Sequence, residues 1–179
     1  FMEFEEFKNL VLERQSCRKF SDRKPEMRDL EEILRTALYS PSACNSQPWR
    51  VYCVTDQNKV KDVALALQDG GANAFASEAK AFFVIAEKNA VLKPFAREKF
   101  GAGHFVKYDI GQLTAYITLA AKAKGLDTCI IGWVNAEKLK AAVGLASDEE
   151  SNIVIAVGYG DCPLRKKTRN SFEEFVEFI

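Results

Sequence analysis

The stretch that organises the chain reads Pro41-Ser42-Ala43-Cys44-Asn45-Ser46-Gln47-Pro48-Trp49. Its two prolines and several small polar residues cannot continue a helix, so we expect a structured loop anchored in the core by Trp49. A helical apolar stripe precedes this loop, and residues 50–55, which are rich in β-forming side chains, follow it. Helix, ordered loop and strand in direct succession indicate a fold that mixes both kinds of element.

Periodicity outward from the loop predicts alternating helices and strands. Helices are expected over residues 4–15, from the turn at Pro25, over 57–68 and 108–124, from an N-cap at Asn135, and over 172–179 after a capping box at Ser171. Strands are expected over 50–55, over the apolar run 81–86, at the segment ending with Ile131 and Gly132, and over 153–160. Residues 88–103 show little periodicity and are interpreted as a variable connection. Because there is no repeat and no linker, residues 1–179 are expected to form a single α+β domain.

Composition excludes several classes of function. With 47% hydrophobic and 28% charged residues, the chain is typical of soluble globular proteins. Its 25 basic and 25 acidic side chains give a net charge of zero, so the chain has no overall positive charge that would attract nucleic acid or an anionic membrane. The acidic, amphipathic start from Phe1 to Glu6 is unlike a secretory signal, and no apolar run approaches the ~20 residues of a membrane span. We therefore expect a cytoplasmic protein without nucleic-acid or membrane partners.

The chain lacks the usual residues for metal or nucleophile chemistry. Its five cysteines have no C-x-x-C spacing, and a zinc set using its one histidine, His104, would need an unusual arrangement of remote ligands. Free thiols in a reducing cytosol are the simpler interpretation. The segment from Gly101 to Gly103 has only two of the three glycines of the dinucleotide fingerprint, and there is no P-loop or G-x-S-x-G motif. We expect no metal site and no catalytic triad.

Two basic segments are candidates for binding a phosphate. Arg14-Gln15-Ser16-Cys17-Arg18-Lys19-Phe20 offers two guanidinium groups and a hydroxyl within five residues. The second segment, Leu164-Arg165-Lys166-Lys167-Thr168-Arg169, has four cations in six residues. Arginine suits phosphate because its planar fork donates two parallel, charge-assisted hydrogen bonds. The alternatives are a solvated basic turn for the first segment and an exposed tail for the second.

Two further segments favour close approach of a ligand to the backbone. The small side chains of the 41–49 loop would admit a flat ring, and its Ser, Asn and Gln side chains offer donors and acceptors. Ile130-Ile131-Gly132-Trp133 ends a strand at a glycine, where backbone N–H groups can face a ligand closely. An ordinary ordered loop and a plain strand-to-helix turn are the alternatives.

In order and in spacing, these segments resemble the FMN-dependent nitroreductase family. The family's R-x-S-x-R/K-x-F stretch matches residues 14–20, and its P-S-x-x-N-x-Q-P-W motif matches 41–49. A G-L-x-T-C-x-I-G type segment matches 125–132, and a strand ending in G-Y followed by K-x-R matches 158–159 and 167–169. The similarity covers nearly the whole chain, apart from residues 88–104.

The resemblance implies an FMN site in which the flavin, rather than a catalytic side chain, carries the chemistry. Carried over by position, the phosphate would be held by Arg14, Ser16, Lys167 and Arg169. Gln15 would lie near the ribityl chain, and Arg18 near the N1/O2 edge of the flavin, where reduction places negative charge. The flavin would be met from the partner subunit by Pro41, Ser42, Ala43 and Asn45. Backbone N–H groups at Ile131 and Gly132 would reach N5, the atom that accepts hydride.

The resemblance also implies a nitroreductase-like α+β fold, in which helices flank a central, mostly antiparallel sheet. Members of the family are intertwined homodimers with FMN at the subunit interface. Two features of the sequence favour a dimer independently. The expected helix over 108–124 is too apolar to leave one face exposed to solvent. The end of the chain is also too apolar to remain in solvent, since it contains Phe172, Phe175, Val176, Phe178 and Ile179.

The implied function is an NAD(P)H oxidoreductase that reduces nitroaromatics, quinones or similar electron-poor small molecules by a ping-pong hydride mechanism. One alternative is another reaction on the same flavin scaffold, such as reductive dehalogenation or dehydrogenation. The other is a non-catalytic flavin-binding protein. The short chain, Ile131 near N5 and the unusual residues 88–104 leave the acceptor and the nicotinamide preference open.

Overall fold

The computed structural model describes residues 3–179, so Phe1 and Met2, where the expected domain and its amphipathic start begin, lie outside the described residues. Within that range, four strands form one antiparallel sheet in the order β1-β2-β4-β3. The strands are β1 (Trp49–Val54), β2 (Ala81–Glu87), β3 (Asp127–Ile131) and β4 (Glu150–Gly158). The predicted α+β class and antiparallel sheet are confirmed.

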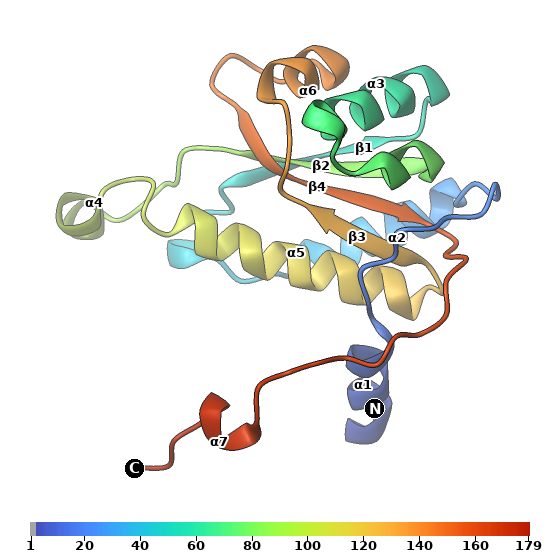
Figure 1. Cartoon of the computed structure of the whole chain (residues 1–179). Coiled ribbons are helices and arrows are strands. Elements are labelled where there is room, and N and C mark those ends of the chain that lie inside the picture. The colour runs from blue at the N-terminus through green and yellow to red at the C-terminus, as the bar shows by residue number, and fades with distance from the viewer. Residues whose placement is uncertain (1–2) are drawn as a thin grey trace.

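Helices cover both faces of the sheet (Figure 1). Helices α3 (Gln57–Leu67) and α6 (Ala136–Val143) pack on one face, and α2 (Met27–Ala37) and α5 (Val106–Ala123) pack on the other. Each face has its own apolar core, and β2 supplies both, with Phe82 facing α3 and Phe83 facing α5. Burial on both faces explains why β2 is a continuous apolar run in the sequence.

Helix α5 has one face in the core and one face in solvent. Ile110, Leu113 and Ile117 recur at helical spacing and are buried against the sheet. On the other side, Tyr108 is 63% exposed and Tyr116 is 41% exposed. No helix among residues 3–179 is both long enough and apolar enough to cross a bilayer.

Two predicted helix boundaries were wrong. Helix α2 begins at Met27 rather than in the turn at Pro25, because the preceding chain is extended and is held by Arg23, whose guanidinium carbon lies 3.8 Å from the Tyr159 ring centroid. Helix α7 covers only Phe172–Phe175 instead of 172–179. The capping box at Ser171 is present, but α7 has no buried residue, and a short helix without packing is marginal.

Two further sequence predictions need correction. The interval 88–103 contains helix α4 (Pro94–Phe100), which begins with proline at its first position. Only Ala96 of α4 is buried, so the helix leaves no apolar stripe in the sequence. Strand β4 runs over 150–158 rather than 153–160, because its polar first residues pair with β2 across an irregularity near Glu87.

The inner face of α3 gives a direct test of the packing. Leu67→Ala should lower the free energy of unfolding by about 2–5 kcal/mol, because truncating a fully buried leucine leaves a cavity. Denaturation in urea, followed by circular dichroism, measures the change. Leu65→Ala is the matched control, because Leu65 lies on the same helix but is 60% exposed. Equal losses in the two variants would contradict the assigned inner face.

Candidate functional site

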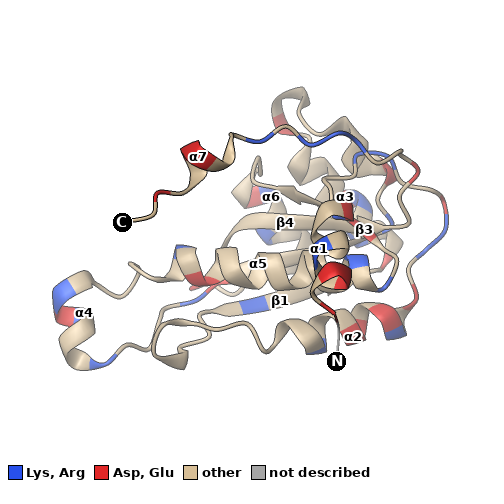
Figure 2. Cartoon of the chain, turned by 90° about the horizontal axis from the view of Figure 1, so that it is seen from below, with Lys and Arg blue, Asp and Glu red and all other residues tan. Residues whose placement is uncertain are grey.

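The two basic segments predicted from the sequence meet in one pocket of about 260 Å³. One wall is the segment after α1 (Phe4–Glu13), and the other is the chain between β4 and α7. Its lining residues are Arg14, Gln15, Ser16, Arg18, Arg165, Lys166, Lys167, Thr168 and Arg169. Every residue predicted to bind the phosphate, together with Gln15 and Arg18, therefore lies in this basic pocket. Figure 2 shows the run of Lys and Arg on the chain before α7.

The first wall is fixed by pairing with the end of the sheet. Ser16 forms a parallel bridge with Thr128 of β3, and the N–H of Cys17 donates to the Thr128 carbonyl at 2.8 Å. Four residues later, Phe20 forms an antiparallel bridge with Gly160. A Cβ at Gly160 would lie 2.4 Å from an Asp127 carboxylate oxygen, so glycine permits this close approach.

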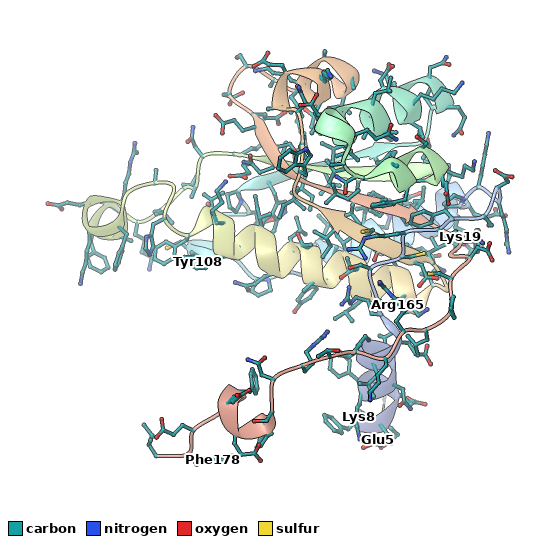
Figure 3. The ribbon with its side chains drawn as sticks, viewed as in Figure 1. Glu5, Lys8, Lys19, Tyr108, Arg165 and Phe178 are labelled. Atoms are coloured by element: carbon teal, nitrogen blue, oxygen red, sulfur yellow. The ribbon has the colours of Figure 1, made fainter. Side chains whose placement is uncertain are left out.

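The second wall is attached to the first by the side chain of Gln15, which is only 7% exposed. Its Nε2 donates to the Pro163 carbonyl at 3.0 Å, and its Oε1 accepts from the backbone N–H of Arg165 at 3.1 Å. The Arg165 guanidinium donates in turn to the Ser16 carbonyl at 2.5 Å. Arg165 is labelled in Figure 3, where the tail passes the segment that follows α1. These contacts give Gln15 a structural role in addition to the predicted ligand contact.

The basic pocket concentrates positive charge without a counterion. Among residues 3–179, none of its Arg or Lys side chains forms an ion pair with a carboxylate. Burial, and then the nearby charges of Arg14 and Arg169, lower the pKa of Lys167 below its ordinary value. Lys167 donates to the carbonyl oxygens of Val11 and Leu12 at the end of α1. A bound anion would relieve this repulsion, so the site fits a phosphate group.

Strand β3 leads from the basic pocket toward the other predicted backbone contact. Its outer edge carries the short bridge to Ser16, and no further pairing on that edge occurs within the described chain. From Thr128 to Gly132 the strand direction advances about 13 Å. Ile131 is 3% exposed, with its side chain in the α3 core, whereas Gly132 is exposed. Gly132, which directly follows β3, is therefore the accessible residue of the two.

The 41–49 loop has an unusual backbone. Three of its non-glycine residues have positive φ: Cys44 at 55°, Asn45 at 52° and Gln47 at 47°. Strained conformations of this kind persist where the surroundings hold them, and they concentrate at functional sites. The hydroxyl of Ser42 accepts from the Gln47 N–H at 2.9 Å, and the Gln47 amide donates back to the Asn45 carbonyl at 3.3 Å.

A buried carboxylate fixes this loop to α5. Asp109, only 2% exposed, accepts the backbone N–H of Ala43 at 3.1 Å through Oδ1. Its Oδ2 is buried without a hydrogen-bond partner among residues 3–179. The sequence prediction missed Asp109, and the available signal was an acid within the apolar stripe of a long helix.

One chain does not bring the loop and the basic pocket together. The loop is attached near the first turn of α5 through Asp109. The basic pocket lies near the last turn, where Lys122 contacts Asp127 of β3 at 3.2 Å and contributes to the positive field at Lys167. These two positions are separated by about 20 Å along the helix. The loop residues Pro41, Ser42, Ala43 and Asn45 therefore lie apart from the residues of the basic pocket.

The absence of a counterion in the basic pocket leads to a prediction for the protein without cofactor. Inorganic phosphate should raise the thermal midpoint more than chloride at equal ionic strength, because phosphate neutralises crowded cations. Differential scanning fluorimetry measures the midpoints. Lys167→Gln should reduce the phosphate-specific increment, whereas the exposed Lys24→Gln should retain it. The same increment in all three proteins would show that phosphate acts elsewhere.

Comparison with known proteins agrees with this architecture. The family model described as the nitroreductase family matches residues 11–159. A protein of Archaeoglobus fulgidus named as an NADH dehydrogenase/NAD(P)H nitroreductase is 29% identical over 154 residues, which cover 86% of this chain and 83% of the relative. The iodotyrosine deiodinase of Thermotoga neapolitana is 25% identical over 173 residues, covering 90% and 92% of the two chains.

The fold has also been solved in related proteins. The structure of an FMN-dependent nitroreductase from Clostridium difficile superposes with a TM-score of 0.75 at 24% sequence identity. The match covers 94% of this chain and 96% of the other. At this identity the likeness establishes a common fold.

Proposed function

Because the chain belongs to the nitroreductase family, we propose that it binds FMN and uses NAD(P)H to reduce nitroaromatics, quinones or similar electron-poor small molecules. The observation that carries this proposal is the basic pocket, which has no counterion in the described chain and lies on the open edge of β3. The names of two relatives, an NADH dehydrogenase/NAD(P)H nitroreductase and an FMN-dependent nitroreductase, support the same assignment.

In the proposed FMN site, residues of both walls and of the end of β3 each contact a different part of the cofactor. Arg14, Ser16, Lys167 and Arg169 hold the phosphate, and Gln15 keeps the two walls together beside the ribityl chain. Arg18 supplies positive charge at the N1/O2 edge, where it stabilises the reduced ring. The backbone at Ile131 and Gly132 would face N5. Bound FMN would supply the two-electron chemistry between NAD(P)H and the acceptor.

We propose further that two chains complete the site. Pro41, Ser42, Ala43 and Asn45 lie near the opposite end of α5 from the basic pocket, and we assign them to the flavin of a partner chain. A second chain would also cover surfaces left apolar in one chain. Helix α1 has no buried residue, and Phe178, 84% exposed, lies on a tail that extends away from the layered body (Figures 1 and 3).

Residues 1–179 are proposed as one domain, and the cytoplasm is the proposed location. The family model spans most of the chain. All five cysteines are free thiols, which suits a reducing compartment.

Reductive dehalogenation is the second candidate, and the likeness to the Thermotoga neapolitana iodotyrosine deiodinase over nearly the full length favours it. Anaerobic turnover of a nitroaromatic, a quinone and an iodinated phenol with the same flavin-loaded protein separates the two reactions. A protein that binds flavin but is not bleached by NADH or NADPH under those conditions would instead be a non-catalytic flavin-binding protein.

The purified protein should be yellow and should release FMN when denatured. Arg14→Ala should weaken FMN binding, because it removes a phosphate contact. The difference in affinity between the parent and the variant should become smaller with added salt, because salt screens that contact in the parent protein. Flavin fluorescence quenching at several salt concentrations measures both effects. Lys24→Ala, outside the basic pocket, serves as the control and should bind normally. A colourless protein that takes up no added FMN would refute the proposed function.

Tyr116→Lys should dissociate the proposed dimer, because it places a charge on the exposed stripe of α5. Analytical ultracentrifugation over a range of protein concentrations would detect the change. Leu65→Lys is the matched control, because Leu65 is also exposed but lies on α3, across the sheet from α5. If the parent protein sediments as a monomer with FMN bound, the two-chain site is wrong.

A further inference from the structure

Two thiols that the flavin chemistry does not use are in contact beside the basic pocket. The Sγ atoms of Cys17 and Cys162 are 3.2 Å apart, although the residues are 145 positions apart in the chain. Cys17 belongs to the first wall and is fully buried, and Cys162 begins the segment that forms the second wall and is half-buried. The contact therefore joins the two walls.

Hydrogen bonds hold both cysteines in this position. The backbone N–H of Cys17 donates to the Thr128 carbonyl at 2.8 Å, and its thiol donates to the Lys19 carbonyl at 3.0 Å. On the other side, the N–H of Asp161 donates to the same Lys19 carbonyl at 2.9 Å, and the Lys19 ammonium lies 2.6 Å from the Asp161 carboxylate. A disulfide bond is about 2.05 Å long, so bond formation needs the two sulfur atoms to approach by little more than 1 Å.

We propose that Cys17 and Cys162 form a reversible disulfide that locks the two walls of the basic pocket together and slows release of the anion bound between them. The second wall is otherwise attached by non-covalent contacts, chiefly the hydrogen bonds of Gln15 and Arg165, and these can open. A covalent bond at Cys162 restricts that opening. Formation of the disulfide does not depend on the proposed function, whereas its effect on FMN release rests on it.

Hydrogen peroxide is a sufficient oxidant, and the accessibility of the two thiols sets the order of steps. Burial raises the pKa of Cys17 to about 12, which keeps it a neutral thiol, so the half-buried Cys162 reacts first. The Cys162 thiolate attacks one peroxide oxygen, forming a sulfenic acid and releasing hydroxide. The Cys17 thiol then attacks the Cys162 sulfur, the S–O bond breaks, and the departing hydroxide takes the Cys17 proton and leaves as water. Overall, two thiols and one peroxide give one disulfide and two waters, and a dithiol reductant reverses the change.

The first experiment needs no flavin. The full chain is treated with a small excess of hydrogen peroxide, digested without reduction and analysed by mass spectrometry. A cross-linked pair of peptides containing Cys17 and Cys162, two hydrogens lighter than their sum and separated by dithiothreitol, is expected. Cys162→Ser should abolish it, whereas Cys53→Ser should retain it, because Cys53 is half-buried on β1 and has no thiol contact among residues 3–179. Separate sulfinic acids without a cross-link would overturn the proposal.

The second experiment measures retention of FMN. Oxidised and reduced proteins loaded with FMN are diluted, and the release rate is followed by the rise in flavin fluorescence. Release should be severalfold slower after oxidation, and dithiothreitol should restore the faster rate. Oxidation should not slow release from Cys162→Ser, and Cys17→Ala provides a second variant that lacks the bond. A cross-linked protein with an unchanged release rate would refute the lock, whereas a cross-linked protein that binds no FMN would refute the proposed function instead.

Discussion

The pairing of residues 14–20 with the end of the sheet is the constraint on which the candidate site depends. Thr128 and Gly160 fix this segment at two points, and Gly160 has no space for a side chain beside Asp127. Arg14 and Ser16 are thereby held against the returning tail. Like charges would otherwise separate the two walls, so Gln15 and the backbone contacts must offset repulsion until an anion is bound.

The length of α5 imposes the second constraint. The helix carries the ordered loop at one end and lies beside the basic pocket at the other, and a rigid helix cannot bring them together. Asp109 holds the loop through the N–H of Ala43, next to the strained Cys44, whereas the flavin that this loop is proposed to contact belongs to the partner chain. Assembly and cofactor binding are therefore linked in the proposed function, because each chain would complete the site of its partner.

Local patterns predicted the kinds of element well, because helix and strand periodicity depends on residues close in sequence. The apolar run of β2, the N-cap at Asn135 and the capping box at Ser171 all follow from short stretches. Predictions failed where packing decides the outcome. Helix α4 leaves almost no apolar stripe, and α7 stops after one turn because none of its residues is buried.

The sequence by itself determined the family resemblance, because that depends on motifs with fixed local spacing, and through the resemblance it predicted the antiparallel α+β fold and the residues of the phosphate site. Only the tertiary structure decided which distant residues meet. Gln15 with Pro163, Asp109 with Ala43, and Cys17 with Cys162 are contacts across 66 to 148 positions. No local pattern specifies such contacts, since they arise when the sheet order and helix layers place separate segments side by side.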